Sequence, residues 1–171
     1  MEILNVKIKN FSDYILGVKL YDNGNLVITA SNPVDYVLDG VKFINRKRIE
    51  SITYESDSFK NRIMELKFQR YLDSLNLKRF KGFEINNFQS LSTTIKEESL
   101  LCEFSFNKED VVYIGNIINV HASSIDVNFY DEKCRFVEND SIDYESMTSI
   151  TILSDYLNSL SDFMKINSLF V

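Results

Sequence analysis

The chain has 171 residues, of which 44% are hydrophobic, 13% aromatic and 26% charged. This composition excludes a disordered chain, and no apolar run approaches the ~20 residues that a membrane-spanning helix needs. The net charge of −6 conceals an asymmetry, because residues 1–86 hold 14 Lys/Arg and 11 Asp/Glu whereas residues 87–171 hold 5 and 14. A basic half and an acidic half are expected to dock on each other or to meet different partners.

The first half of the chain predicts five short strands and then a helix. Apolar residues alternate with polar ones in the first strand, and Asn23-Gly24 is a strong hairpin turn after the second. Ser56 or Asp57 is a suitable cap for a helix that follows the fifth strand. The expected strands cover residues 4–8, 13–21, 26–30, 41–45 and 49–54.

Residues 74–98 connect the two halves. The segment is polar overall, but it contains several apolar side chains, too many for a free tether. We therefore expect a packed connector with a short helix near residues 88–97. These apolar residues include Phe80, Phe83, Ile85 and Phe88.

The second half predicts the same succession of elements. A turn near residues 130–133 indicates that the third strand continues into a longer hairpin through Phe136. Ser154 or Asp155 is a suitable cap for a final helix, which has an apolar face from Tyr156 to Met164. The expected strands cover residues 101–107, 111–119, 124–130, 140–144 and 147–153.

The two halves match when the chain is shifted by 98 positions, the separation of Gly17 and Gly115. No gap is needed between residues 4 and 57, and Ser-Ile-Thr at 51–53 falls on Ser-Ile-Thr at 149–151. Such self-similarity predicts a tandem repeat. We expect a first module at residues 1–73, a packed connector at 74–98 and a second module at 99–171. Each central glycine is expected to mark a bend in its strand.

Five short strands with a bent second strand resemble the small barrels of the SH3-like and Sm-like groups. The segment Arg46-Lys47-Arg48-Ile49-Glu50-Ser51-Ile52 is similar to the last hairpin of Sm-like proteins, with Lys47 in place of their glycine. The repeat also looks like those of uncharacterised bacterial proteins. The resemblance implies a mainly β fold with added helices, namely two tandem five-stranded small barrels, each followed by an α-helix.

Basic residues provide the strongest candidate for a binding site. The first group is expected near a hairpin tip, and the second is interleaved with phenylalanines that can stack on bases. Both groups are also explained as solvated strand ends or as contacts to the acidic second module. The candidate residues for an anionic partner are Lys42, Arg46, Lys47, Arg48, Lys78, Arg79 and Lys81.

Nothing in the sequence indicates an enzyme, a metal site or a cofactor. His121 is the sole histidine and is expected in a hairpin turn, and the acidic run from Glu138 to Glu145 lacks the glycine of a calcium loop. Cys102 and Cys134 are too few for a disulfide framework, and Cys102 is expected to be buried. Residues 1–7 show no secretory signal, so we expect a cytoplasmic protein with reduced thiols.

The sequence favours a non-enzymatic protein-interaction module. One alternative is an Sm-like nucleic-acid-binding protein that uses the basic first module, although a net-acidic chain is unusual for that class. Another is an immunity-type inhibitor whose acidic face covers a basic toxin. No membrane partner is expected, and neither the protein partner nor the oligomeric state follows from the sequence.

Overall fold

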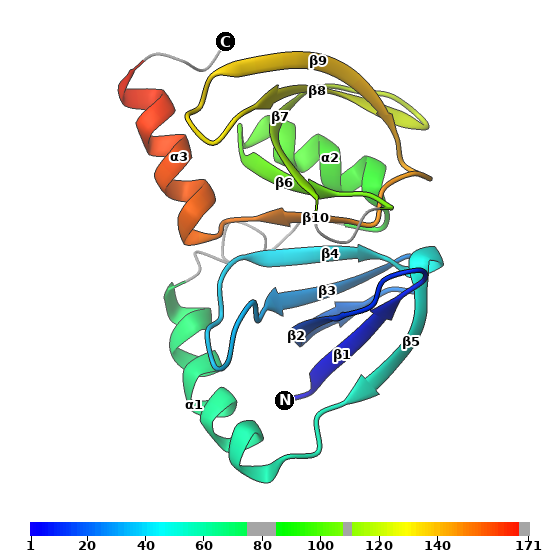
Figure 1. Cartoon of the computed structure of the whole chain (residues 1–171), viewed down its shortest axis with the longest axis vertical. Helices are drawn as coiled ribbons and strands as arrows, with labels where there is room; N and C mark the ends of the chain where they lie inside the picture. The colour runs from blue at the N-terminus through cyan, green and yellow to red at the C-terminus, as the bar shows by residue number, and fades with distance from the viewer. Residues whose placement is uncertain (75–84, 108–110, 168–171) are drawn as a thin grey trace.

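The computed structural model describes residues 1–74, 85–107 and 111–167 and shows a mainly β protein (Figure 1). Lys78, Arg79 and Lys81 lie outside these residues. The first half contains β1 (Ile3–Ile8), β2 (Tyr14–Asp22), β3 (Leu26–Ser31), β4 (Val41–Asn45), the 3-10 turn η1 (Arg46–Arg48), β5 (Ile49–Tyr54) and α1 (Ser58–Ser74). The second contains α2 (Phe88–Glu97), β6 (Leu101–Ser105), β7 (Val112–Val120), β8 (Ser124–Tyr130), β9 (Phe136–Asp143), β10 (Ser149–Ile152) and α3 (Asp155–Ile166).

The described strands form a single antiparallel sheet in the order β5-β1-β2-β3-β4-β10-β6-β7-β8-β9. The order in the first half, β5-β1-β2-β3-β4, has the same form as β10-β6-β7-β8-β9 in the second. Ten strands were expected, and each is present. β9 begins at residue 136 rather than 140, because the chain turns back directly after β8.

The two halves are joined by pairing between β4 and β10, which we call the junction. Phe43 lies opposite Ile150 and Val41 opposite Ile152, and the backbone N–H of Asn45 extends the ladder to the Thr148 carbonyl at 2.9 Å. The expectation of two separate closed barrels is not confirmed. The edge of β4 pairs with β10 of the other half, so the sheet stays open with β5 and β9 at its ends.

Each half contains a glycine where two strands approach closely. A Cβ on Gly17 would lie 2.7 Å from Thr29 Cβ, and a Cβ on Gly115 would lie 2.5 Å from Val127 Cγ1. Both distances are too short for carbon–carbon contacts. The strand register shifts two to four residues after each glycine, as expected for strands that bend at these points.

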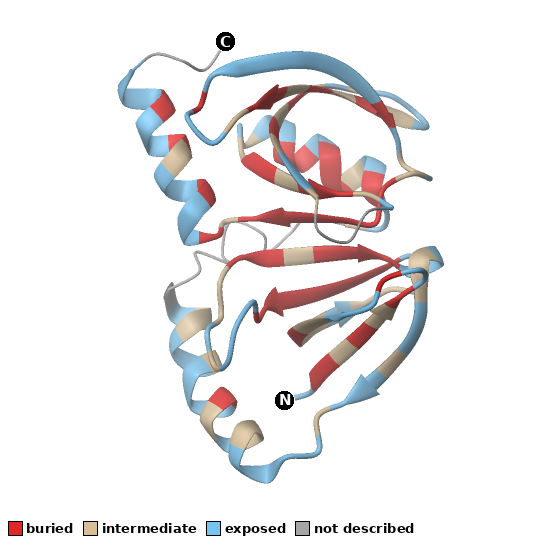
Figure 2. Cartoon of the chain, viewed as in Figure 1, coloured by how far each residue is buried: buried red, intermediate tan, exposed pale blue. Residues whose placement is uncertain are grey.

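A large apolar core crosses the junction (Figure 2). Leu26 and Phe43 of the first half pack in one cluster with Phe88 of α2 and with Phe104 and Ile150 of the second half. A smaller cluster, which includes Val6, Val27 and Ile44, fills the first half on the other face of β4. The cores of the two halves therefore lie on opposite faces of the junction strands.

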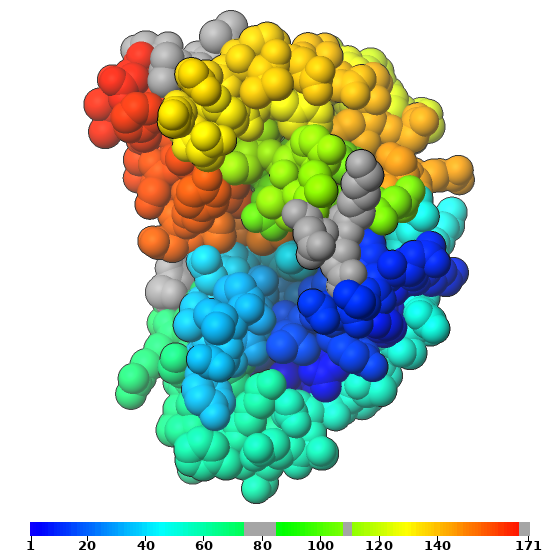
Figure 3. All heavy atoms as spheres, viewed as in Figure 1, coloured from blue at the N-terminus to red at the C-terminus, as the bar shows by residue number. Residues whose placement is uncertain are grey.

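The helices α1 and α3 begin at polar caps that match the sequence prediction. The Ser154 side chain caps α3 by accepting from the Leu157 N–H, and Asp57 Oδ1 accepts from the Phe59 N–H at the start of α1. The expected connector helix is confirmed at the predicted residues as α2, which buries Leu91 and Ile95 in the core. Figure 3 shows the first half below and the second above, in contact across the middle of the molecule.

Candidate functional site

The basic residues of the first half are divided between two places. Arg46, Lys47 and Arg48 form η1 at the end of β4, where the Asn45 side chain accepts from the Lys47 N–H at 3.1 Å. Lys42 is the second residue of β4, four residues before Arg46, and is half-buried. The structure therefore does not gather these four residues into one exposed basic surface.

The two arginines of η1 are already engaged. Arg46 Nη1 lies 3.7 Å from Asp22 Oδ2 in its own half, and Arg48 Nη2 donates to the backbone carbonyl of Glu145 across the junction. The second contact shows that the basic turn does meet the acidic half, although through a carbonyl group rather than a carboxylate. The Lys47 side chain has no described hydrogen bond or ion pair and is exposed.

Lys42 occupies a more enclosed position than the sequence indicated. Its neighbours across the sheet are Thr29 on β3 and Thr151 on β10, with Glu103 one strand further. Burial lowers the pKa of Lys42 below its ordinary value, while the charge of Glu103 acts in the opposite direction. A small pocket beside it, of about 220 Å³, has Asp13 and Tyr14 in its wall.

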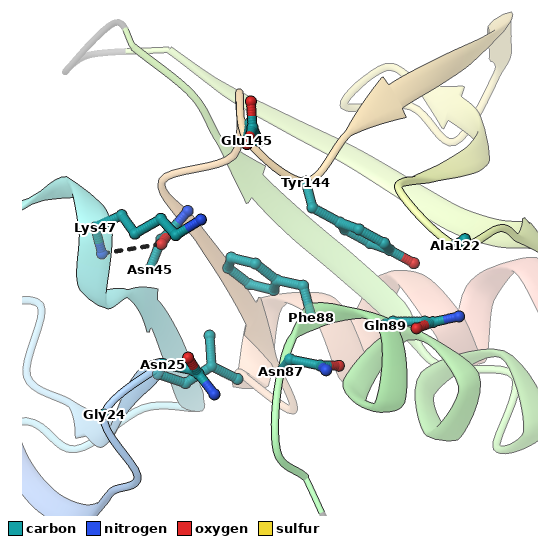
Figure 4. Close-up of a pocket in the computed structure, with 11 residues that line it drawn as sticks. Gly24, Asn25, Asn45, Lys47, Asn87, Phe88, Gln89, Ala122, Tyr144 and Glu145 are labelled. Atoms are coloured by element: carbon teal, nitrogen blue, oxygen red, sulfur yellow. Dashed lines mark hydrogen bonds between the residues drawn. The ribbon is translucent and has the colours of Figure 1, made fainter.

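A second pocket lies at the junction, and we call it the junction cleft (Figure 4). It has a volume of about 350 Å³ and is formed by five separate segments of the chain. Its lining residues are Gly24, Asn25, Leu26, Asn45, Lys47, Asn87, Phe88, Gln89, Ala122, Tyr144 and Glu145. The sequence pointed to Lys47 alone as a binding residue here, because the cleft exists only once β4 pairs with β10.

Hydrogen bonds and ring contacts hold the walls of the junction cleft in place. Asn23 Nδ2 donates to the Ile85 carbonyl at 2.8 Å, and Asn25 Nδ2 donates to the Asn86 carbonyl at 3.1 Å. The rings of Phe88 and Tyr144 are stacked, with centroids 6.3 Å apart and an interplanar angle of 13°. These contacts fix the β2–β3 turn and the start of α2 as walls of the cleft.

A third feature is the outer strand β9, whose edge faces away from β8 at the end of the sheet. Apart from Ile142, every residue of β9 is exposed, as the pale blue ribbon in Figure 2 shows. Glu138, Asp140 and Asp143 lie on this strand, and we call them the acidic edge. The sequence showed these residues as part of an acidic run but did not indicate that their strand would end the sheet.

The described residues show little that is typical of a catalytic centre. His121 Nε2 lies 2.9 Å from Asp126 Oδ2, and this contact, together with the Asn119 amide, holds the pKa of Asp126 below its ordinary value. The ring of His121 has no described contact to a nucleophile. Cys102 is fully buried, as expected, and burial raises the pKa of its thiol. The described part of the chain contains no group of three or more His, Cys, Asp or Glu placed to hold a metal ion.

Comparisons with protein-family models, with curated proteins and with solved structures gave no match. The functional class is therefore argued from this chain alone, as a mainly β protein with an open sheet edge and a cleft between its halves. Among the described helices, none has the length and apolar character to cross a membrane.

Proposed function

We propose that this protein is a non-enzymatic protein-interaction module that binds an extended, basic segment of its partner along β9. The observation that carries the proposal is the combination of an open strand edge with exposed acidic side chains on that strand. An edge strand offers backbone N–H and C=O groups to which a partner strand can add, although on β9 the Ser141 N–H already donates to Asp140 Oδ1 at 2.8 Å. The acidic edge would select a partner with lysine or arginine at matching positions.

The side chains of β9 argue against a second copy of this chain as the partner. At the junction, β4 presents Val41 and Phe43 to β10, and these apolar pairs join the halves. The positions 98 residues later on β9 are Asn139 and Ser141, both exposed. A copy that paired with β9 as β10 pairs with β4 would thus lose the apolar contacts of the junction. The polar residues at these positions of β9 favour a polar partner.

The two narrower alternatives are affected differently by the geometry. An immunity-type inhibitor that covers a basic toxin is a special case of this proposal, since it would use the same acidic surface. Nucleic-acid binding through the first half has less support, because Arg46 and Arg48 are engaged within the protein and Lys42 lies in the middle of the sheet.

The experiment uses a ten-residue peptide of alternating lysine and threonine as a probe of charge and strand addition. We expect saturable binding to the full chain by NMR titration, with no binding of the matching glutamate–threonine peptide. A lysine–threonine peptide that is N-methylated at every second residue keeps its charge but cannot complete a backbone ladder. It should therefore bind at least about tenfold more weakly.

Charge reversal identifies the strand that binds. The double variant Glu138→Lys/Asp140→Lys should reduce affinity for the probe by about tenfold or more, because it turns two attractive contacts into repulsive ones. Glu50 is exposed on β5 at the opposite end of the sheet, so Glu50→Lys is the control and should leave affinity nearly unchanged. The proposal would be contradicted if the double variant and Glu50→Lys lost affinity equally. It would also be contradicted if the N-methylated peptide bound the parent as tightly as the unmodified lysine–threonine peptide.

A further inference from the structure

We infer that the junction cleft is a binding site for a small zwitterion, a ligand of amino-acid or dipeptide size with a free carboxylate and a free ammonium group. This inference is independent of the proposed partner binding, because the cleft and the acidic edge share no residue. The cleft volume of about 350 Å³ lies at the small end of the range for ligand sites, roughly 300–1,000 Å³.

Two opposite charges line the cleft without neutralising each other. Lys47 approaches from the first half and Glu145 from the second, and no ion pair joins these two described residues. The carbonyl of Glu145 is used by Arg48, which fixes the backbone at that position and leaves the Glu145 carboxylate available. A ligand that carries both charges would satisfy both side chains at once, its carboxylate on Lys47 and its ammonium on Glu145.

The body of the ligand would contact an aromatic wall. Figure 4 shows the Lys47 side chain extending toward Phe88, with Tyr144 beyond that ring. Phe88 is only 6% exposed, so the part of the ring that lines the cleft is a limited apolar surface between polar groups. An aromatic or branched aliphatic side chain fits this surface better than a polar one.

The polar groups around the wall suit an amide or amino-acid backbone. Gln89 has no described side-chain hydrogen bond and keeps both donor and acceptor capacity. At the start of α2, Asn87 and Ser90 form a capping box in which the Asn87 side chain accepts from the Ser90 N–H. We assign charge recognition to Lys47 and Glu145, the two charged side chains that line the cleft.

The inference predicts a specific pattern among three probes measured by calorimetry on the full chain. L-phenylalanine should bind saturably, whereas its methyl ester lacks the carboxylate and its N-acetyl derivative lacks the ammonium group. Each blocked derivative should bind at least about tenfold more weakly, since each leaves one charged side chain without its partner. The dipeptide glycyl-phenylalanine provides a second zwitterion of larger size.

Variants assign each charge to its residue. In Lys47→Met, phenylalanine and its methyl ester should bind with equal affinity. This variant keeps Glu145, so it should still bind N-acetyl-phenylalanine more weakly than phenylalanine. In Glu145→Gln, phenylalanine and N-acetyl-phenylalanine should bind equally. The controls are Lys133→Met and Glu132→Gln, exposed positions on the β8–β9 turn, which should retain the full pattern.

Two results would overturn the inference. One is the absence of saturable binding of both phenylalanine and glycyl-phenylalanine to the folded parent at concentrations up to about 10 mM, which corresponds to a free energy too small for a specific site. The other is discrimination between the probes that survives in both cleft variants. Thermal melting of each variant checks that it is folded, and neither result bears on binding at β9.

Discussion

The side-chain amide of Asn45 joins the two halves of the protein by donating a hydrogen bond to the backbone carbonyl of Met147 at 2.9 Å. The bond is buried and crosses the junction, and the oxygen of the same side chain accepts from the Lys47 N–H at the start of η1. A buried carbonyl that loses its donor retains the cost of its removal from water.

We predict that Asn45→Ala lowers the free energy of unfolding by about 1–3 kcal/mol, because it leaves the Met147 carbonyl without its partner. The matched control is Asn25→Ala. It also removes a side-chain amide hydrogen bond, the one that Asn25 donates to the Asn86 carbonyl beside α2, but at an exposed position. The control should change stability by less than about 0.5 kcal/mol. Urea unfolding measures both variants, and similar losses in the two would argue against a special role for Asn45.

The close approach of β2 and β3 at Gly17 gives a second prediction. Gly17→Val should destabilise the protein by about 1–3 kcal/mol, because the new side chain would collide with Thr29 and with the Ala30 carbonyl. Thr53 is exposed on β5, so Thr53→Val adds a valine to a strand without crowding and should be nearly neutral. A Gly17→Val protein that melts with the parent would show that the strands can separate at no cost.

Local patterns predicted the elements of this fold but not how the halves join. Alternation, turn residues and caps located the strands and α2, because these signals depend on neighbours in sequence. The pairing of Phe43 with Ile150 depends on two strands more than 100 residues apart, and the apolar edge of β4 could equally have faced a closed barrel.

The candidate site illustrates the same limit at the level of side chains. Lys42 and Arg46 are close in sequence, but Lys42 lies in β4 between β3 and β10, whereas Arg46 lies in the turn η1. Conversely, Lys47, Phe88 and Glu145 are far apart in sequence and meet only in the junction cleft. Sequence proximity was therefore a poor guide to which functional groups share a site.

Lys42 gives a prediction for the dependence of stability on pH. Its pKa in the folded protein lies below the ordinary lysine value of 10.5, so the folded state disfavours the charged form. We expect Lys42→Met to be more stable than the parent near pH 7. Lys47→Met, at an exposed position, is the control and should be nearly neutral.

The sign of this pH effect follows from proton linkage. Between the folded pKa of Lys42 and 10.5, the unfolded chain binds more protons, so the parent gains stability relative to Lys42→Met as pH rises. The advantage of the variant should therefore be largest below the folded pKa and should shrink toward pH 10.5. Urea unfolding of both proteins from pH 7 to 10.5 tests this. A stability difference in favour of Lys42→Met that grows with pH would contradict a lowered pKa for Lys42.

Hydrogen exchange in the presence of the lysine–threonine probe tests the central claim most directly, because it locates a partner strand on the backbone. Strand addition predicts slower exchange of the outward-facing amides of β9 (Phe136–Asp143), with β5 (Ile49–Tyr54) unchanged at the opposite end of the sheet. Slower exchange at β5 or around η1, with β9 unaffected, would contradict the account.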